Sequence, residues 1–230
     1  MKCESREQTH KSAIDGKNRG EKMVMKNFVV FEGIDGAGTS TQINLLKQRA
    51  EAEKKFIFSA EPTKKETGVF LRRVLSGEVK ARAESAVYLF AADRNEHIFG
   101  EDGVKEHTQN GFIEVSDRYF FSSIAYQGMS CGEELPKSVN SAFPLPELLF
   151  FFDIDVDEAL RRIERRGEEK EIFEKREFLE KIAASYRRII AEYEQKETGM
   201  KIVRIDAQKS ADEIAKTIWR EISELPILKI

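Results

Sequence analysis

The stretch that decides the fold of this 230-residue chain is Phe31-Glu32-Gly33-Ile34-Asp35-Gly36-Ala37-Gly38-Thr39-Ser40-Thr41-Gln42. The β-forming residues 28–31 lead into it, and a helical pattern starts at residue 43. A strand, a glycine-rich turn and a helix in this order are the context of a phosphate-binding P-loop. The glycines let several backbone N–H groups point at one anion, and the helix N-terminus adds partial positive charge. Ser40 lies where such a loop supplies a hydroxyl ligand for Mg²⁺.

One position departs from the P-loop pattern. The segment from Gly33 to Ser40 fits G-x-x-x-x-G-K-[ST] except at Thr39, which stands in place of the lysine. A threonine cannot place a cation between the β- and γ-phosphates. A glycine-rich strand-to-helix turn without any ligand therefore stays open as an alternative for this stretch alone.

Composition limits the class of protein. Hydrophobic residues make up 40% of the chain, which is enough for the core of one ample α/β domain or two small ones. The net charge of −3 argues against broad electrostatic binding of nucleic acid. The two cysteines, Cys3 and Cys131, form no disulfide framework, so we expect a reduced, cytoplasmic protein. The three histidines lack metal-ligand spacing, and no apolar stretch reaches the ~20 residues of a membrane helix.

Strand and helix patterns alternate along the chain. We expect strands at 28–31, 56–59, 112–116, 148–154 and 202–205. We expect helices at 40–53, 68–75, 82–98, from 122 onward, and at 156–166, 178–193 and 211–225, with a loop over 128–146 and a charged turn over 168–175. This order predicts an α/β fold with a doubly wound five-stranded parallel sheet and helices on both faces. Residues 1–24 are polar and are expected to form a flexible tail before one domain over 25–230.

Polar residues gather where the predicted strands end. Asp35 and Gly36, then Glu61 and Pro62, then Asp117 and Arg118 follow three different strands, at the edge where ligands bind in such sheets. Phosphoryl transfer requires cations around the transferred group, and arginines suit contacts to its oxygens. The arginines considered for this are Arg72, Arg94, Arg118, Arg161, Arg162, Arg165 and Arg166. A solvated helix face remains the ordinary interpretation of each one, and we favour it for Arg161 and Arg165.

Phe90 and Arg94 lie four residues apart, so they share one face of the predicted 82–98 helix. A ring and a guanidinium together could stack on a base and hydrogen-bond its edge. The alternative is that Phe90 belongs to the core and that Arg94 lies on the surface.

Taken together, these motifs resemble the thymidylate kinase family of P-loop nucleoside monophosphate kinases. The most specific match is 117–127, Asp-Arg-Tyr-Phe-Phe-Ser-Ser-Ile-Ala-Tyr-Gln, against the signature D-R-Y-x-x-S-x-x-A-Y-Q. Residues 31–38 resemble the family P-loop, 89–94 its base-binding helix, and 149–167 the strand and helix that lead into its lid. The resemblance implies transfer of phosphate from Mg²⁺-bound ATP to dTMP, giving dTDP, a lid around 162–176 and a homodimer, with neither nucleic acid nor membrane as a partner.

The resemblance also implies roles for individual residues. The implied catalytic residues are Asp35, Arg118 and Arg166. The implied ATP contacts are Gly33, Ile34, Asp35, Gly36, Ala37, Gly38, Thr39, Ser40, Thr41, Ala207 and Gln208. The implied dTMP contacts are Asp35, Glu61, Pro62, Arg72, Phe90, Arg94, Arg118, Ser122, Ser123, Tyr126 and Gln127, with Phe90 stacked on thymine and Tyr126 crowding a ribose 2′-hydroxyl. Ser40 and Asp117 would serve Mg²⁺.

Three positions depart from the family pattern. Thr39 replaces the P-loop lysine, Ala60 stands where many members have arginine, and Ile172 stands where the bacterial lid has arginine. Two cations that would stabilise the transition state are therefore missing, and Arg166, Lys64, Lys65 or Lys170 could substitute. A catalytically weakened nucleotide-binding homologue and a kinase for another nucleoside monophosphate remain as alternatives.

Overall fold

The fold was analysed in a computed structural model, which describes residues 23–165 and 172–229. Its five strands are β1 Val24–Gly33, β2 Phe56–Ala60, β3 Ile113–Asp117, β4 Leu145–Asp153 and β5 Lys201–Asp206. All neighbouring strands are parallel, in the order β2-β3-β1-β4-β5. The helices are α1 Thr39–Ala50, α2 Glu66–Leu75, α3 Ala83–Phe99, α4 Val104–Gln109, α5 Phe120–Cys131, α6 Glu134–Val139, α7 Val156–Glu164, α8 Ile172–Glu194 and α9 Ala211–Ser223, with 3₁₀ turns η1 Asn140–Ala142 and η2 Pro226–Leu228.

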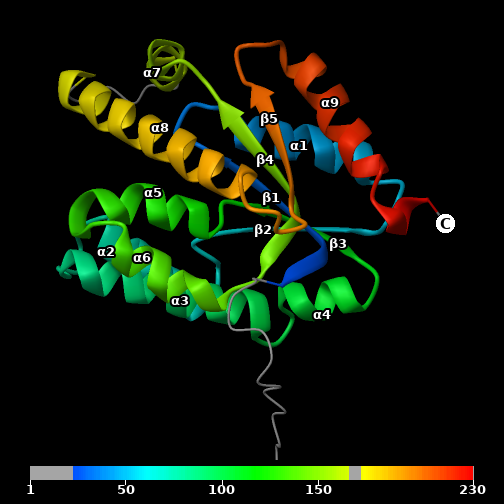
Figure 1. Ribbon diagram of the computed structural model, residues 1–230, viewed down its shortest axis with the longest axis horizontal. Helices are drawn as coiled ribbons and strands as arrows, with labels where there is room; N and C mark the ends of the chain where they lie inside the picture. The colour runs from blue at the N-terminus through cyan, green and yellow to red at the C-terminus, as the bar shows by residue number, and fades with distance from the viewer. Residues whose placement is uncertain (1–22, 166–171, 230) are drawn as a thin grey trace, which may run out of the picture.

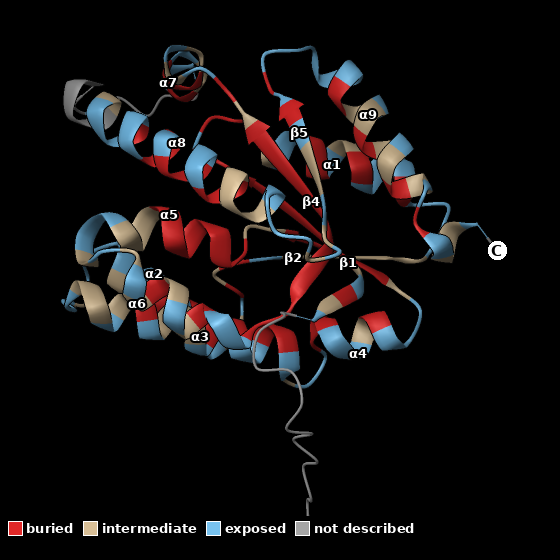
Figure 2. Cartoon of the chain, viewed as in Figure 1, coloured by how far each residue is buried: buried red, intermediate tan, exposed pale blue. Residues whose placement is uncertain are grey.

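Helices cover both faces of this sheet. Helices α1 and α9 pack against each other on one side, and α3, α5 and α8 follow one another on the other side (Figure 1). The central strands β1, β3 and β4 are mostly buried, whereas the edge strands β2 and β5 are mostly half-buried or exposed (Figure 2). Every residue of β4 except Asp153 is buried, as expected for an apolar strand covered on both faces. The predicted doubly wound five-stranded parallel sheet is confirmed.

The start of β1 departs from regular pairing. Its register against β4 shifts between Met25 and Val29, and Asn27 adopts a positive φ of 62°. Glu147 of β4 stabilises this bulge, because its carboxylate accepts hydrogen bonds from Lys26 Nζ at 2.9 Å and from the Asn27 backbone N–H at 2.7 Å. Asparagine is among the residues that tolerate this conformation best. The strand begins at Val24, one residue before the predicted domain boundary, and residues 1–22 of the predicted tail lie outside the described chain.

Several predicted element boundaries were wrong. The segment 128–146, predicted as a loop from its prolines and glycines, contains α6 and η1. Pro136 lies in the first turn of α6, where a missing N–H breaks no helical hydrogen bond. Helix α4 was not predicted, since six residues are too few to show a helical period.

The predicted charged turn over 168–175 was wrong from Ile172 onward, where α8 begins. The charged residues that follow in α8 pair along the helix: Arg176 Nη1 lies 3.6 Å from Glu180 Oε1, and Lys181 Nζ lies 2.5 Å from Glu177 Oε1. Such pairs at i,i+4 favour helix over turn. Residues 166–171 of the predicted lid, with Arg166 and Lys170, lie outside the described residues.

The apolar side chains of α2 are only partly buried. Leu71 is buried, but Phe70 and Leu75 are 41% and 53% exposed. Val69 and Tyr88 are exposed on the same pair of helices, α2 and α3. These exposed apolar side chains belong to two helices that pack against each other.

Candidate active site

The P-loop of this chain adopts a backbone shape that only glycine accepts at two positions. Gly36 and Gly38 have φ values of 84° and 95°. A Cβ on Gly36 would lie 2.5 Å from the Ala159 carbonyl oxygen of α7, so even alanine would push the loop away from that helix. The loop lines a cavity of about 190 Å³ with Asp117, Arg118 and Ile163. The N-terminus of α1 lies at this cavity. Because the first turn of the helix carries no acidic residue, its positive end is free to face a phosphate group.

The two threonines predicted to contact ATP, Thr39 and Thr41, differ in their position relative to this cavity. Thr41 is exposed on the first turn of α1 and does not line the cavity. Thr39 does line it, half-buried, so the position of the missing lysine faces the space where phosphates would lie.

The residues predicted to serve Mg²⁺ come together. Ser40 Oγ donates to Asp117 Oδ2 at 3.2 Å. The other oxygen, Asp117 Oδ1, is buried without a hydrogen-bond partner in the described structure. Within residues 23–165 and 172–229 no cluster of three or more His, Cys, Asp or Glu side chains is suited to a metal. A hydroxyl and one carboxylate fit Mg²⁺, which keeps several waters and binds through phosphates as well.

A second cavity, of about 210 Å³, lies beside the first. It is lined by Asp35, Glu61, Pro62, Leu75, Phe90, Arg94, Arg118, Tyr119, Ser122, Tyr126 and Gln127. Nine of these eleven residues were predicted as dTMP contacts; Leu75 and Tyr119 were not. Asp35 and Arg118 line both cavities, so they mark the place where the two spaces meet.

Arg118 is held at this junction by its backbone and its side chain. Its φ is 73°, and its N–H donates to the Phe31 carbonyl at 2.9 Å. Its guanidinium donates to Asp35 Oδ1 at 2.6 Å and to the Gly33 carbonyl at 3.2 Å. Burial disfavours the charge, but nearby Tyr186, Tyr126, Asp35 and Glu32 outweigh it and raise the pKa of Arg118 well above its ordinary value. Arg118 therefore remains a fixed cation.

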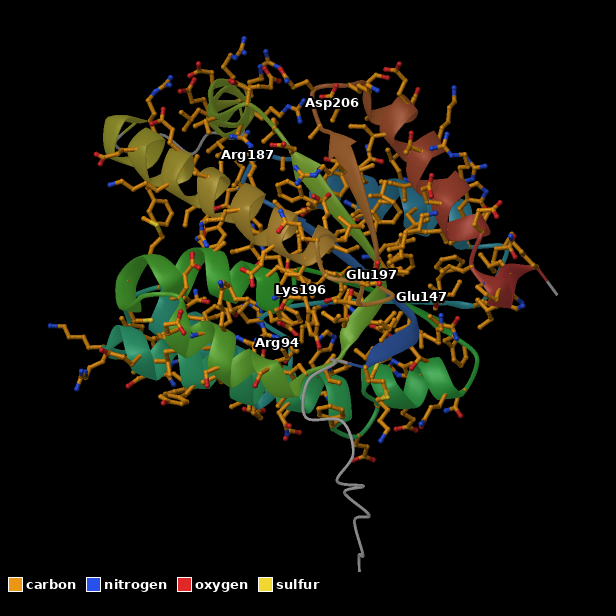
Figure 3. All side chains as sticks on the ribbon, viewed as in Figure 1. Arg94, Glu147, Arg187, Lys196, Glu197 and Asp206 are labelled. Atoms are coloured by element: carbon orange, nitrogen blue, oxygen red, sulfur yellow. The ribbon has the colours of Figure 1, made fainter. Side chains whose placement is uncertain are left out.

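Arg94 lines the second cavity and is buried among the side chains of the fold (Figure 3). One of its Nη atoms donates to Glu61 Oε2 at 2.5 Å and to Ser123 Oγ at 3.1 Å, and the other donates to Asn140 Oδ1. Its Nε lacks a hydrogen-bond partner within the described structure. A buried donor without a partner is rare in proteins and indicates a ligand at this position.

Phe90 lies one helical turn from Arg94 and is half-buried. The alternative of a core Phe90 and a surface Arg94 was wrong on both counts, because the arginine is the buried member of the pair. Gln127 Oε1 is also buried without a partner in the described structure, and its side chain lines the same cavity. The cavity lining thus includes a ring, Phe90, and two residues, Arg94 and Gln127, that each have a buried polar atom without a partner in the described structure.

Glu61, which lines this cavity, contacts both Arg94 and His97. Its second oxygen lies 2.9 Å from His97 Nδ1, and His97 Nε2 lies 2.8 Å from Ser59 Oγ. Periodicity did not identify His97, since it places apolar rather than polar residues on the inner face of a helix.

Four predicted site residues lie elsewhere. Arg72 donates to the Pro62 and Thr63 carbonyls and does not line the second cavity. Gln208 lines a different cavity, of about 410 Å³, between β5 and α8. Ala207 is buried, and its carbonyl accepts from Arg162 at 2.9 Å. Lys65, a candidate substitute for the P-loop lysine, instead donates to the carbonyls of Glu96 and Glu101.

Arg162, one of the arginines considered for phosphoryl transfer from the sequence, lies beside the P-loop. Its Nη1 would be 3.7 Å from a Cβ placed on Gly38, and Glu158 holds its Nε at 2.9 Å. It therefore connects α7, the P-loop and the loop after β5. Its spacing from Glu158, four residues along a predicted helix, was visible in the sequence but is typical of an ordinary surface pair.

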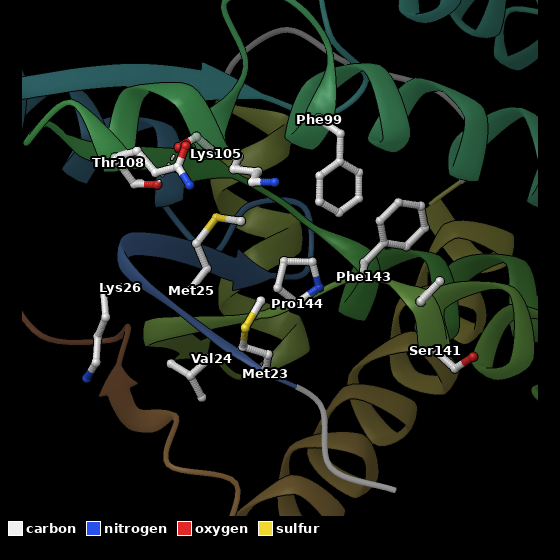
Figure 4. A pocket seen from close by; sticks show the side chains of 12 residues that line it. Met23, Val24, Met25, Lys26, Phe99, Lys105, Thr108, Ser141, Phe143 and Pro144 are labelled. Atoms are coloured by element: carbon white, nitrogen blue, oxygen red, sulfur yellow. Dashed lines mark hydrogen bonds between the residues drawn. The ribbon is translucent and has the colours of Figure 1, made fainter. Parts of the chain in front are cut away.

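A larger cavity, of about 450 Å³, lies at the other end of the sheet (Figure 4). Met23, Met25, Phe99, Phe143 and Pro144 give it a mostly apolar lining. It lies at the amino ends of β1 and β4, whereas ligands of open α/β sheets bind at the carboxyl ends. Its volume alone does not make it the active site.

The sequence that forms this site also matches a known family. Residues 31–218 match the sequence model of the thymidylate kinase family. The chain belongs to the thymidylate kinase family. A thymidylate kinase of Leptospira borgpetersenii serovar Hardjo-bovis (strain L550) is 37% identical over 196 residues, which cover 82% of this chain and 89% of that protein.

Two further relatives are placed provisionally in the same family by their names. A protein of Treponema pallidum (strain Nichols) is 38% identical over 206 residues, covering 90% of this chain and 99% of its own length. A protein of Methanococcus maripaludis (strain C6) is 44% identical over 172 residues, covering 72% of this chain and 78% of its own length.

Among the helices within 23–165 and 172–229, none is long and apolar enough to cross a membrane.

Proposed function

We propose that this chain transfers the γ-phosphoryl group of ATP to dTMP, giving ADP and dTDP. The observation that carries the proposal is the junction of the two cavities at Asp35 and Arg118. A P-loop cavity on one side suits a nucleoside triphosphate, and a cavity with a ring and base-edge hydrogen-bond groups on the other side suits a nucleoside monophosphate. Arg118 at the junction can contact the acceptor phosphate, as expected for a cation at the site of phosphoryl transfer.

In this proposal the chain acts by positioning and by charge. The P-loop N–H groups and the N-terminus of α1 hold the donor phosphates. Arg118 orients the acceptor phosphate, whose oxygen forms the new bond to the γ-phosphorus as the bond to the β–γ bridging oxygen breaks. Ser40 and Asp117 would hold Mg²⁺, which would neutralise charge on the donor phosphates. Asp35, already paired with Arg118, is placed to contact the acceptor's sugar.

A coupled ADP-release assay with dTMP, dUMP, CMP, GMP and AMP tests the proposal. We expect release to be fastest with dTMP by a wide margin. Equal release with another nucleoside monophosphate would favour the rival kinase specificity. No acceptor-dependent release, with ATP still bound, would favour the nucleotide-binding homologue that Thr39 suggests.

Replacement of Phe90 tests the base site. Phe90→Ala should weaken dTMP binding, because base–aromatic stacking contributes about 1–3 kcal/mol in single-stranded nucleic-acid complexes. ATP binding should change little, since Phe90 does not line the P-loop cavity. Isothermal titration with each nucleotide measures both effects, and Asn95→Ala, at an exposed position of the same helix, is the control. Equal losses for both nucleotides would show that Phe90 acts through folding.

Restoring the P-loop lysine tests the departure at position 39. Thr39→Lys should raise kcat, or leave it unchanged, because the side chain faces the P-loop cavity where donor phosphates would lie. The companion variants Arg162→Ala and Arg166→Ala should lower kcat more than they weaken ATP binding if either arginine supplies the missing charge. Steady-state kinetics with varied ATP separates kcat from KM. Full kcat in both arginine variants would leave Lys64 as the next candidate.

We also propose a homodimer in the cytoplasm. The support for a dimer is the apolar surface of Val69 and Phe70 on α2 and Tyr88 on α3, which is exposed in one copy. The support for the location is the sparse cysteine content of the sequence. Sedimentation equilibrium of the native chain and of Phe70→Asp tests the dimer, since a charge on this surface should shift the population to monomer.

A further inference from the structure

Glu32, directly before the P-loop, is a fully buried carboxyl group surrounded by hydrogen-bond donors. Its Oε1 accepts from the backbone N–H of Tyr119 at 2.8 Å and from that of Ser122 at 3.2 Å. Its Oε2 accepts from Ser122 Oγ at 2.6 Å and from the Tyr186 hydroxyl at 2.8 Å. The two backbone donors belong to the start of α5, so Glu32 anchors that helix and, through Tyr186, also contacts α8.

The same two hydroxyls contact Arg118. Arg118 Nη1 donates to Ser122 Oγ at 3.3 Å and to the Tyr186 hydroxyl at 3.5 Å. The two hydroxyl oxygens are 2.7 Å apart, so they form a triangle with Glu32 Oε2. A hydroxyl has one proton and two lone pairs. A carboxylate at Glu32 can take both protons, which leaves the hydroxyl oxygens available as acceptors for Arg118.

This arrangement is costly for the folded chain. Burial raises the pKa of Glu32 to about 7, although Ser122, Arg118, Tyr186 and Tyr119 oppose the shift. A carboxyl with a folded pKa above its unfolded value contributes stability at low pH, and that contribution is lost as the pH rises through about 7. The charged and titratable groups around it are Arg118 and Tyr119 from the β3–α5 junction and Tyr186 from α8, with Asp35 and Tyr126 beyond Arg118.

We propose that Glu32 is a positioning residue for the phosphoryl acceptor: its carboxylate orients the Ser122 and Tyr186 hydroxyls so that their oxygens hold the Arg118 guanidinium. This inference rests on the proposed function, in which Arg118 contacts the acceptor phosphate. A neutral carboxylic acid or amide at position 32 turns a donor of its own toward these hydroxyls, so it competes with the Arg118 guanidinium for their lone pairs.

The test is Glu32→Gln, which keeps the shape of the side chain and removes its charge. We expect kcat/KM for dTMP at pH 8 to fall about tenfold or more, and KM for ATP to stay within about twofold. The melting temperature at pH 8 should be unchanged or higher, because the variant no longer ionises a buried carboxyl. A merely structural role would lower the melting temperature and affect both substrates, which would overturn the proposal.

The pH profile gives a second readout. The phosphate of dTMP has its own ionisation near pH ~6, which is common to both proteins. The ratio of kcat/KM between the native chain and Glu32→Gln should therefore rise through about pH 7 as Glu32 ionises. A ratio that stays constant from pH 5.5 to 8.5, about 1.5 units on each side of this pKa, would overturn the proposal.

Tyr186→Phe carries the test if Glu32→Gln does not fold. It removes one bridging hydroxyl and should lower kcat/KM for dTMP by several-fold, about 3 to 10 times. Tyr193→Phe is the control on the same helix, where the ring packs against Phe121, and it should keep native kinetics. Native kinetics in Tyr186→Phe would overturn the proposal. Dependence of ADP release on dTMP is measured first in the native chain, so a failure of the proposed function is recognised separately.

Discussion

Arg118→Ala is expected to lower kcat/KM for dTMP by about 10³-fold or more, since arginines that stabilise transferring phosphoryl groups contribute effects of this size. The guanidinium lines both cavities and contacts Asp35 and the Gly33 carbonyl. The variant therefore removes the cation at the point where donor and acceptor phosphates meet. Steady-state kinetics with varied dTMP, at saturating ATP, measures the effect.

Two further variants separate this loss from misfolding. Arg118 has a φ of 73°, which glycine adopts without strain, so Arg118→Gly should be more stable than Arg118→Ala by about 1 kcal/mol. Both should be equally inactive if the guanidinium is what matters. Arg73→Ala, which removes an exposed arginine paired with Glu78, should keep native activity. A loss of less than about tenfold in Arg118→Ala would contradict the proposed role.

Arg94→Ala is expected to have the second-largest effect, on both stability and substrate choice. The Arg94 and Glu61 side chains are 1% and 3% exposed, so the variant leaves a buried carboxylate without its main partner. Breaking a buried pair in this way costs about 3–5 kcal/mol. Urea unfolding measures this part, and the panel of nucleoside monophosphates measures the loss of preference for dTMP.

The double variant Arg94→Met with Glu61→Gln separates the two consequences. It replaces the pair by neutral side chains of similar length and should recover most of the lost stability. It should not recover the preference for dTMP, because the Arg94 guanidinium, whose residue lines the second cavity, is gone. Full recovery of the preference would show that another residue recognises the base edge.

The parts of this molecule that the sequence predicted are those governed by local patterns. The glycine spacing from Gly33 to Gly38 predicted the P-loop, and the apolar run around Phe150 predicted a strand covered on both faces. The alternation of strands and helices predicted the parallel sheet, because right-handed crossovers leave few other arrangements. The strand-end residues Asp35, Asp117 and Arg118 then had to lie at one edge of that sheet.

The parts that the sequence did not predict depend on polar groups buried by distant segments. Helix α3 buries Asp93, Arg94 and His97 beside apolar residues and leaves Tyr88 exposed, which hydrophobic periodicity does not predict. Periodicity ranks side chains by their transfer from water, whereas these polar groups are buried because other segments supply hydrogen bonds to them. Thr63 satisfies Asp93 from the loop after β2, and Glu61 satisfies both Arg94 and His97.

Glu32 and Tyr186 show the same division between sequence and tertiary structure. They are 154 residues apart in the chain, yet the Tyr186 hydroxyl donates to Glu32 Oε2 at 2.8 Å in the fold. The sequence by itself determined the sheet, the P-loop and the identity of the residues at the strand ends, because each follows from spacing along the chain. Which carboxylate holds which arginine was decided by the tertiary structure alone, because the packing of α5 and α8 over the sheet brings those donors and acceptors within hydrogen-bonding distance.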